Sequence, residues 1–442
     1  MKYKKYPSYK DSGVDWLGEI PSEWINTKLK YHSFIYNGNS ISDNEKENYE
    51  NLNTNFSIPY ISTKDIDSNF LSIDYDNGMR ISVNNDKFRR AKKGSSLICI
   101  EGGSAGKKLG LLEKDVCFVN KLACIDSYNN LDNKFCNYIL RSSVFNYLFS
   151  LSTTGLIPGV SINQLKDFEI ILPPLNEQQQ IANYLDEKTS KIDTLIEKQT
   201  KQIELLKEKR QAVISHAVTK GINPNVPMKD SGVEWLGEIP EHWITPKLIY
   251  ISSRIGDGLH STPLYEDNTG FYFINGNNLI NGNILFRNTS KEVSELEYVK
   301  HFIRLDSNSL LLSINGTIGN VALYNDEKII LGKSAAYINC LKKMNREFLL
   351  FYLQSNCAKR YYDIEVTGTT IFNLSLNSIR KMNIALPPYL EQHQIIRYCR
   401  EMQFKYNTLI QKSNKSIELL KEKRTALISA CVTGKIDVRE KV

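Results

Sequence analysis

The segment Glu101–Lys108 (EGGSAGKK) has the glycines and lysines of a loop that could bind phosphate. It departs from the phosphate-loop pattern, because only three residues separate Gly102 from Gly106 and Lys108 stands where Ser or Thr would bind magnesium. The aligned segment in the second half of the chain, Ile314–Asn320 (INGTIGN), contains no lysine. Both segments therefore predict tight glycine turns between strands, and a nucleotide site is not expected.

Other catalytic constellations are also incomplete. Two Pro-Pro pairs are similar to the methyltransferase motif in which Asn or Asp precedes Pro-Pro-aromatic, but Leu172 and Leu386 stand at the position of that acceptor. No strand is followed by a GxGxxG loop, and no HExxH, GxSxG or Cys–His set occurs. We therefore expect a non-catalytic chain that binds no metal and no cofactor of its own.

The cysteines and the apolar runs indicate where such a chain would be found. The eight cysteines form no CxxC pair and no Cys/His spacing suited to zinc. The N-terminus, MKYKKYPSYK, has no apolar segment of the kind found in signal peptides, and no apolar run is long enough to cross a bilayer. We expect buried, reduced thiols in a cytoplasmic protein without a membrane partner.

Basic residues occur in turns beside loops rich in Asn, Ser and Thr. Phe88–Lys93 (FRRAKK) is the densest run, and Ser62–Asp65 (STKD) and Asn275–Asn278 (NGNN) are such loops. Loops of this composition can contact base edges while Lys and Arg hold phosphates, although a charge run is more often a solvated surface. The formal net charge of +7 is compatible with double-stranded DNA as a partner. The candidate DNA-binding residues are Ser62, Thr63, Lys64, Arg89, Arg90, Lys92, Lys93, Ser104, Lys107, Lys108, Arg254, His260, Ser261, Thr262, Asn275, Asn277, Asn278, Arg287, Asn315 and Thr317.

The elements that position these residues occur twice. Residues 10–24 (KDSGVDWLGEIPSEW) return as 229–243 (KDSGVEWLGEIPEHW), and residues 203–210 (IELLKEKR) return unchanged as 417–424. The offsets are 229 − 10 = 219 and 417 − 203 = 214. A period of this length is too long for a solenoid repeat and predicts two large, similarly built halves.

Each half has a variable block and a constant block. The variable blocks, about 25–172 and 244–386, contain short β-rich runs bounded by Gly, Asn, Asp and Ser, with a helix expected at Asn133–Ser150 and near Arg346–Tyr362. We interpret both as α/β (α+β) globular domains. The expected boundaries are 1–24 and 223–243 for the repeated N-terminal segment, 25–172 and 244–386 for the globular domains, and 173–222 and 387–442 for the helical regions.

The constant blocks predict long helices that begin after Pro173–Pro174 and Pro387–Pro388 and end at Gly221 and Gly434. Asn176 with Gln179 resembles a capping box. A helix of roughly 40 residues would be ~60 Å long. The apolar stripe has spacings of three, four and seven, with a four-residue slip, and it includes Leu195 and Leu409.

Because the two stripes match residue by residue, we predict an antiparallel coiled coil with pseudo-two-fold symmetry. The alternative is that each helix packs on its own domain. The expected interface residues are Leu185, Ile192, Ile196, Ile203, Leu206, Val213, Tyr406, Ile410, Ile417, Leu420 and Leu427.

The whole arrangement resembles the specificity subunits of type I restriction-modification systems. The resemblance covers essentially the full chain. It rests on WLGEIP (Trp16–Pro21, Trp235–Pro240), on the LPP…EQ…I helix starts (Leu172–Ile181, Leu386–Ile395), on IELLKEKR, and on VTKGI and VTGKI (Val218–Ile222, Val432–Ile436). Asp257–Pro263 (DGLHSTP) and Gly316–Gly319 (GTIG) are similar to turns of the family's second recognition domain, whereas the first domain has NGNSIS (Asn37–Ser42) and GSAG (Gly103–Gly106).

The resemblance implies two target-recognition domains, each of which reads one half of a split, asymmetric DNA site. It also implies that the helices set the spacer and dock two modification subunits, which carry the methyl transfer and bind S-adenosylmethionine, and that restriction subunits join this complex. Two other hypotheses stay open. One is a methyltransferase fused to its own reader, against which the missing motifs argue. The other is a stand-alone two-domain DNA-binding regulatory protein.

Overall fold

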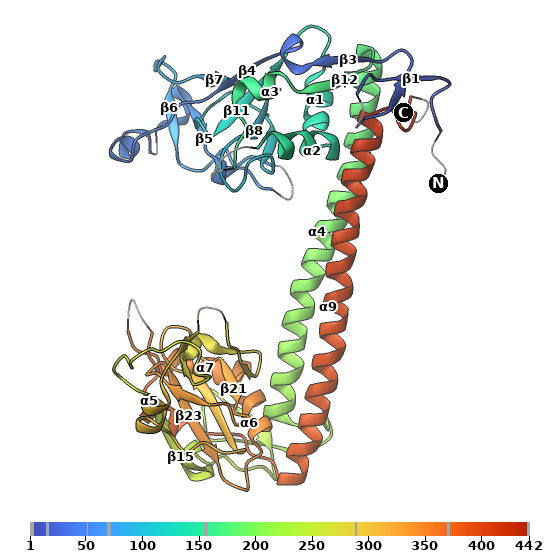
Figure 1. Ribbon diagram of the computed structural model, residues 1–442. Helices are drawn as coiled ribbons and strands as arrows, with labels where there is room; N and C mark the ends of the chain where they lie inside the picture. The colour runs from blue at the N-terminus through green and yellow to red at the C-terminus, as the bar shows by residue number, and fades with distance from the viewer. Residues whose placement is uncertain are drawn as a thin grey trace. The chain divides into compact units, whose positions relative to one another are not determined.

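The computed structural model describes residues 4–14, 17–50, 52–68, 72–153, 158–287, 290–368 and 372–439. The chain forms two compact units (Figure 1). Unit 1 consists of Met1–Thr200 and Lys415–Val442, and unit 2 consists of Lys201–Asn414. Each unit therefore contains one α/β domain and one part of each long helix. Trp16, part of the first WLGEIP segment, lies outside the described residues.

The α/β domain of unit 1 contains two four-stranded sheets. One has the order β4-β11-β8-β9 and is antiparallel throughout, and the other has the order β6-β5-β10-β7 with β5 and β10 parallel. The domain closes where its first strand, β3, pairs with its last, β12, and places Ile25 opposite Leu172. The strands are β3 (Ile25–Lys28), β4 (Ser33–Asn37), β5 (Ser57–Ile61), β6 (Arg80–Ser82), β7 (Arg90–Ala91), β8 (Ser96–Cys99), β9 (Leu109–Leu111), β10 (Val116–Phe118), β11 (Leu122–Ser127) and β12 (Glu169–Leu172).

The α/β domain of unit 2 repeats this topology. Its antiparallel sheet has the order β15-β23-β20-β21, and in its second sheet, β19-β16-β22, strands β16 and β22 are parallel. A bridge between Ile244 and Leu386 closes the domain as the β3–β12 pair does in unit 1. The strands are β15 (Ser252–Asp257), β16 (Tyr272–Ile274), β17 (Leu279–Ile280), β18 (Asn283–Ile284), β19 (Lys291–Glu292), β20 (Ser309–Ser313), β21 (Val321–Leu323), β22 (Ile329–Leu331) and β23 (Ala335–Cys340).

The helices expected at Asn133–Ser150 and near Arg346–Tyr362 are each divided into two. The prediction of one continuous helix in each domain is therefore wrong in detail. In unit 1 the side chain of Ser142 accepts a hydrogen bond from the backbone N–H of Phe145 and starts a new helix, and in unit 2 Ser355 does the same for Ala358. A serine that caps a helix in this way favours a boundary over a continuous helix. The helices of the two domains are α1 (Asn133–Leu140), α2 (Ser143–Ser152), α3 (Ile162–Lys166), α5 (Glu295–Lys300), α6 (Arg346–Leu353), α7 (Asn356–Glu365) and α8 (Leu376–Lys381).

Two long helices follow the domains, α4 (Leu175–Lys220, 46 residues) and α9 (Tyr389–Val432, 44 residues). The capping box expected at Asn176 is wrong, because α4 already begins at Leu175 and the N–H of Glu177 donates to the carbonyl of Pro174 at 2.9 Å. The helices end as expected at glycines with positive φ, +82° at Gly221 and +71° at Gly434. Within the described residues, no helix is long and apolar enough to span a membrane.

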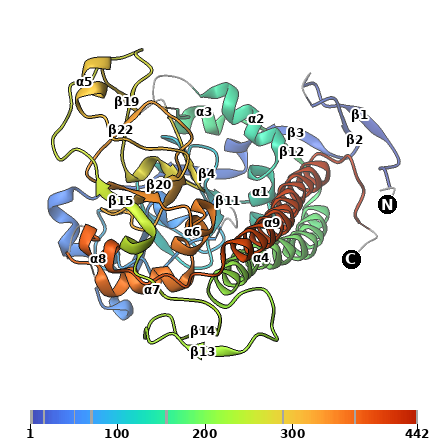
Figure 2. The same cartoon turned by 90° about the horizontal axis from the view of Figure 1, so that it is seen from below.

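The two long helices run side by side and antiparallel in each unit (Figures 1 and 2). In unit 1 Arg424 of α9 forms an ion pair with Asp193 of α4, and in unit 2 Arg210 of α4 donates to the side chain of Asn407 of α9. Every expected interface position is at least half-buried, whereas Leu195 and Leu409 of the predicted stripe are 48% and 38% exposed, so the prediction is wrong for these two. The buried positions are Leu185, Ile192, Ile196, Ile203, Tyr406 and Leu427, and the half-buried ones are Leu206, Val213, Ile410, Ile417 and Leu420.

The ends of the long helices also enter the domain cores. At these ends the alternative, that each helix packs on its own domain, holds. The core of unit 1 joins Leu185 of α4 and Ile428 of α9 to the domain. Each repeated N-terminal segment forms a hairpin that packs on a helix end, β1–β2 (Tyr9–Asp11, Glu19–Pro21) on α9 and β13–β14 (Met228–Asp230, Glu238–Pro240) on α4. Trp24 and Trp243, which follow these hairpins, are fully buried.

Candidate nucleic-acid interface

The two polar loops expected to contact DNA are the same structural element in the two units. Each forms a 3-10 turn, η4 (Thr63–Asp65) and η6 (Gly276–Asn278). The turns are closed by reciprocal side-chain bonds between Ser62 and Asp65 in unit 1 and between Asn275 and Asn278 in unit 2. These bonds occupy polar groups of Ser62, Asn275 and Asn278, and they leave Lys64 and Asn277 exposed.

The glycine turn of unit 1 lies against the Ser62–Asp65 loop. Lys108 Nζ donates to the carbonyl of Thr63 at 2.6 Å, which fixes this lysine and leaves Lys107 exposed beside the half-buried Ser104. The prediction of a tight turn is confirmed, because Gly102 and Gly106 have φ of +88° and +72° between β8 and β9.

The glycine turn of unit 2 lies between β20 and β21, as predicted. Gly316 and Gly319 have φ of +73° and +89°. Thr317 is exposed at its tip, and Asn315 is half-buried where it bridges to Asn373. This turn therefore offers neutral polar groups where unit 1 offers an exposed lysine.

A second cluster in unit 1 forms around Arg89. Its guanidinium donates to the carbonyl and side-chain oxygens of Asn37 at 3.0 and 2.9 Å, and its backbone N–H donates to Asn39. The run 88–93 is thereby brought to the Asn37–Ser42 loop. Arg90 is exposed and binds the carbonyl of Val83, and Lys92 and Lys93 are also exposed.

The candidate residues of unit 2 lie mostly in exposed loops. Arg254 stacks over Tyr337 with 5.4 Å from the guanidinium carbon to the ring centroid, and His260 pairs with Asp257 at 2.9 Å. Ser261, Thr262 and Arg287 are exposed. Neutral and histidine side chains therefore replace most of the lysines that unit 1 presents.

The loops Asn37–Ser42 and Asp257–Pro263 share a backbone constraint although their sequences differ. A Cβ at Gly38 would lie 1.8 Å from the carbonyl oxygen of Phe118, and a Cβ at Gly258 would lie 2.1 Å from that of Leu331. Only glycine fits so close an approach of two backbones. Equivalent loops thus leave the two sheets at equivalent places with different side chains.

One buried glutamine in each unit joins the α/β domain to its long helix, and neither glutamine was predicted. Gln178 Oε1 accepts from the N–H of Asp132 at 2.9 Å, and Gln392 Oε1 accepts from Asn345 at 2.8 Å. Their amide nitrogens donate to Pro173 and Pro387 at 2.8 and 3.1 Å. Both glutamines are fully buried. The repeated EQ pair in the LPP motif was the available signal.

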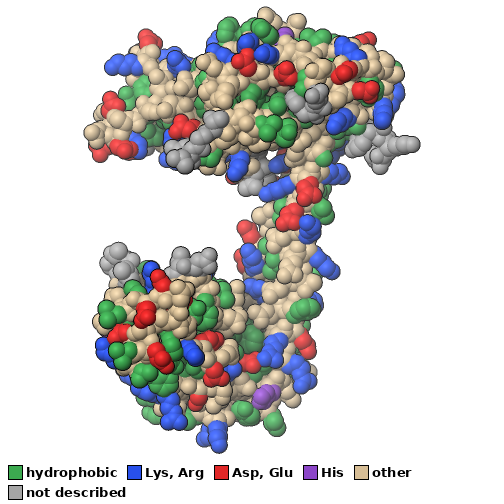
Figure 3. Space-filling model, viewed as in Figure 1, with side chains coloured by type: hydrophobic (Ala, Val, Ile, Leu, Met, Phe, Trp, Pro, Cys, Tyr) green, Lys and Arg blue, Asp and Glu red, His purple; other side chains and the backbone are tan. Residues whose placement is uncertain are grey.

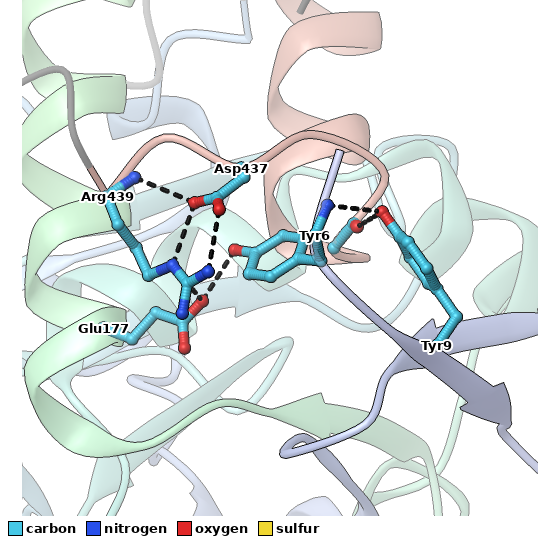
Figure 4. A network of polar contacts seen from close by, with 6 residues as sticks. Tyr6, Tyr9, Glu177, Asp437 and Arg439 are labelled. Atoms are coloured by element: carbon cyan, nitrogen blue, oxygen red, sulfur yellow. Dashed lines mark hydrogen bonds and ion pairs between the residues drawn. The ribbon is translucent and has the colours of Figure 1, made fainter. Parts of the chain in front are cut away.

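A further network clamps the start of α4 (Figure 4). Tyr6 donates through its hydroxyl to Glu177 at 2.6 Å, and Arg439 binds Asp437 at 2.8 Å with its guanidinium over the Tyr6 ring. The Arg439 guanidinium holds the pKa of Asp437 below its usual value. Burial and Glu177 raise the pKa of Tyr6, so this phenol stays protonated. These contacts join the segments around Tyr6 and Asp437 to the start of α4.

The chemistry of this surface is that of binding. On the face shown in Figure 3, Lys and Arg side chains are interspersed with Asp and Glu over both units and along the helices. Among the described residues, no group of three or more His, Cys, Asp or Glu is placed to hold a metal ion. Exposed donors on turns beside basic side chains suit contacts to phosphates and base edges.

Comparison with known proteins agrees with this geometry. The sequence profile of the type I restriction modification DNA specificity domain matches residues 21–205 and 258–419. The MjaIX specificity subunit of Methanocaldococcus jannaschii is 23% identical over 459 residues, covering 100% of this chain and 99% of the relative. The MjaVIII specificity subunit of the same organism is 24% identical over 353 residues, covering 78% and 79%.

Solved structures show the same fold. A chain from a study of complex assembly and conformational transition of the type I R-M system superposes with a TM-score of 0.70 at 16% identity, covering 94% of this chain and 99% of the other. The HsdS subunit from Thermoanaerobacter tengcongensis gives 0.51 at 17% identity, covering 94% and 98%. The chain belongs to the type I restriction modification DNA specificity family. Its role is DNA sequence recognition in a restriction-modification system.

Proposed function

We propose that each α/β domain reads one half of a split, asymmetric DNA site. The observation that carries this proposal is that equivalent turns hold different exposed groups, such as Lys64 in η4 and Asn277 in η6. Different donors and acceptors select different bases, whereas two identical readers would select a palindrome.

The test exchanges side chains in one reader at a time. The chain is produced with its modification subunit, and methylated sites are mapped for Asn277→Ala and for Thr63→Ala. Asn277→Ala is expected to relax one half-site by about 1–3 kcal/mol per lost base contact and to leave the other unchanged. Lys92→Ala, at an exposed lysine outside these two turns, is the phosphate-contact control and should weaken binding without relaxing the sequence of either half-site. Relaxation of both half-sites by one substitution would contradict the proposal.

We further propose that the long helices dock two modification subunits. The support is a pair of exposed leucines in each unit, Leu195 with Leu419 in unit 1 and Leu205 with Leu409 in unit 2. The repeat offset of 214 relates 195 to 409 and 205 to 419, so the two patches are equivalent. Apolar groups that a helix pair leaves exposed are suited to a protein partner.

Leu205→Asp with Leu409→Asp is expected to abolish binding of one modification subunit while the chain keeps its melting temperature. Gln202→Asp is the matched control, because it adds the same charge at an exposed polar position. Size-exclusion mass measured with the modification subunit decides. Full-size complexes formed by the leucine variant would overturn the docking proposal.

We propose that the helices also set the spacer of the DNA site. Inserting four residues into both α4 and α9 lengthens the pair by ~6 Å, or nearly two base pairs at ~3.4 Å each. The spacer should lengthen while both half-sites stay the same. A changed half-site with an unchanged spacer would contradict this role.

The chain itself is proposed to be non-catalytic, with S-adenosylmethionine bound by the modification subunits and restriction subunits joining the complex. All eight cysteines are buried thiols, which supports a cytoplasmic setting. Incubating the isolated chain with labelled S-adenosylmethionine and DNA should give no transfer. Transfer that is lost when a residue of this chain is substituted would favour a fused methyltransferase.

A further inference from the structure

A cavity of about 410 Å³ in unit 1 lies between the glycine turn, helix α2 and the last part of α9. Its charged lining residues are Lys107, Arg141 and Arg424, and among the described residues no Asp or Glu lines it. Asn146, Ser150 and Thr425 add polar groups to the wall. The cavity therefore concentrates positive charge and hydrogen-bond donors with no anion of its own.

Arg141 has a side-chain donor that this arrangement leaves without an acceptor. Its Nε is buried and has no hydrogen-bond acceptor, while the residue as a whole is half-buried. Its contact is with the face of Tyr138, 5.1 Å from the ring centroid. Burial lowers the pKa of Arg141, and repulsion from Arg424 acts in the same direction.

The carboxylates nearest to Arg141 are already engaged. Asp186 binds Lys134 at 2.7 Å and accepts the hydroxyl of Tyr138 at 2.6 Å. Asp193 pairs with Arg424. A buried donor without an acceptor is destabilising, and a bidentate oxyanion is a ligand whose geometry matches a guanidinium.

Unit 2 contains the equivalent cavity without this charge. Both are lined by an aromatic ring that packs on a glycine of the turn: an added Cβ would lie 2.8 Å from Phe149 at Gly106 and 3.1 Å from Tyr362 at Gly319. The offset in both cases is 213 (319 − 106 and 362 − 149). Applied to position 141, it leads to 354, which is Gln354.

The lining of the second cavity, about 500 Å³ in volume, has one cation and one anion, Lys359 and Asp363. The positive charge of the unit 1 cavity is therefore not part of the repeated frame. Its presence in one unit alone indicates a function specific to unit 1.

We propose that the unit 1 cavity is a phosphate-binding site in which the Arg141 guanidinium holds the phosphate oxygens and Lys107 supplies further positive charge. Because Arg424 is already paired with Asp193, the lining keeps Lys107 and Arg141 as cations without a lining carboxylate, and two such cations favour a phosphate over a monoanion such as a carboxylate. The volume admits a mononucleotide as well as inorganic phosphate. The phosphate belongs either to a free monoester or to a DNA backbone, and the site does not depend on which bases the domains read.

The experiment titrates the full chain with inorganic phosphate, with deoxyadenosine monophosphate and with a short duplex of unrelated sequence, by calorimetry at constant ionic strength. Arg141→Gln installs the residue type of unit 2 and should weaken binding at least about tenfold, as expected for a lost charge-assisted bidentate contact. Lys359→Gln in the unit 2 cavity is the matched control and should change nothing.

A melting experiment separates ligand binding from a structural role. Without phosphate, Arg141→Gln should melt at the same or a higher temperature, because it removes a guanidinium whose buried Nε lacks an acceptor. Phosphate should raise the melting temperature of the native chain and not of the variant. An Arg141-dependent response to the free phosphates assigns a small-molecule site, and one to the duplex alone assigns a backbone phosphate. Equal affinity of the native chain and Arg141→Gln for all three probes would overturn the proposal.

Discussion

Unit 1 and unit 2 share the same buried contacts and differ in nearly every charged one. Gln178 and Gln392 make the same three kinds of bond between a helix start and its domain. Ser429 accepts from the N–H of Ser143 at 2.8 Å, and Ser215 accepts from that of Asn356 at 2.9 Å. Neutral hydrogen bonds therefore define the repeated frame, with the two glutamines buried and Ser143 exposed.

The ion pairs show how freely charge varies on that frame. Lys134 of unit 1 pairs with Asp186, and at the equivalent positions of unit 2 Glu347 pairs with Arg400, so the signs are exchanged. Partly exposed pairs contribute little to stability, whichever residue carries the cation. Buried amides and hydroxyls tolerate no such exchange, because an unsatisfied buried donor costs about 1–3 kcal/mol. Specificity can therefore change on the surface while the frame stays fixed.

The largest expected effect tests whether each repeated hairpin supports its own unit. Trp24→Ala should lower the free energy of unfolding by about 3–5 kcal/mol, because a fully buried indole is lost. Hydrogen exchange should increase first in the core of unit 1, and Trp243→Ala should act first on unit 2. Phe34→Ala and Tyr250→Ala, at aromatics 63% and 71% exposed, are the controls. If either tryptophan variant increased hydrogen exchange equally in both units, the claim that each hairpin supports its own unit would be wrong.

The next effect concerns the helix pair, where equivalent positions are buried to different extents. Ile203 is 7% exposed, and Ile417 is half-buried. Ile203→Asp should destabilise the chain by about 3 kcal/mol, because it buries a charge without a partner. Ile417→Asp should cost less, and Lys201→Asp, on the exposed side, should cost least. Urea denaturation measures the three, and the reverse order for the two isoleucines would contradict the observed packing.

The exchanged ion pair gives a smaller effect. Lys134→Glu sets two carboxylates against each other and should cost about 1 kcal/mol. Adding Asp186→Arg recreates the polarity of unit 2 and should recover most of this loss. Chemical denaturation of the single and double variants measures it. A double variant no more stable than the single one would show that the frame of unit 1 requires its own polarity.

The smallest effect is a dependence on pH that only unit 1 should have. The pKa of Asp437 is lowered by Arg439, so its stabilising contribution is present above an unfolded value of about 3.9 and is lost as the pH falls through the lower folded pKa. The equivalent residues of unit 2 are Asn223 and Asn225, which do not titrate. The difference in melting temperature between the native chain and Asp437→Asn should shrink from pH 6 to pH 3. A constant difference would contradict it.

The fold was largely predictable, because periodicity and repetition report buried stripes directly. The paired apolar positions gave both long helices and most of their interface. Leu195 and Leu409 were misplaced because the four-residue slip turns that part of the stripe toward the surface. The breaks at Ser142 and Ser355 depend on which of two local bonds a serine makes, and the tertiary context decides this.

The candidate site was predictable only at the level of loops. Ser62 and Asn275 have the composition of base-contacting residues, yet their side chains close their own turns. Lys108 is likewise held by a backbone carbonyl. Which polar group stays free depends on turn geometry, and the burial of the Arg141 Nε without an acceptor depends on contacts between elements distant in sequence.

The claim that two different readers share one frame is tested most directly by exchanging one of them. Residues 25–172 are replaced by the matching domain of a relative, the chimera is produced with the modification subunit, and its methylated sites are mapped by single-molecule sequencing. The account predicts a split, asymmetric site for the native chain and, for the chimera, one new half-site beside one unchanged half-site at the same spacing. A palindromic or continuous site, or a change in both half-sites, would contradict it.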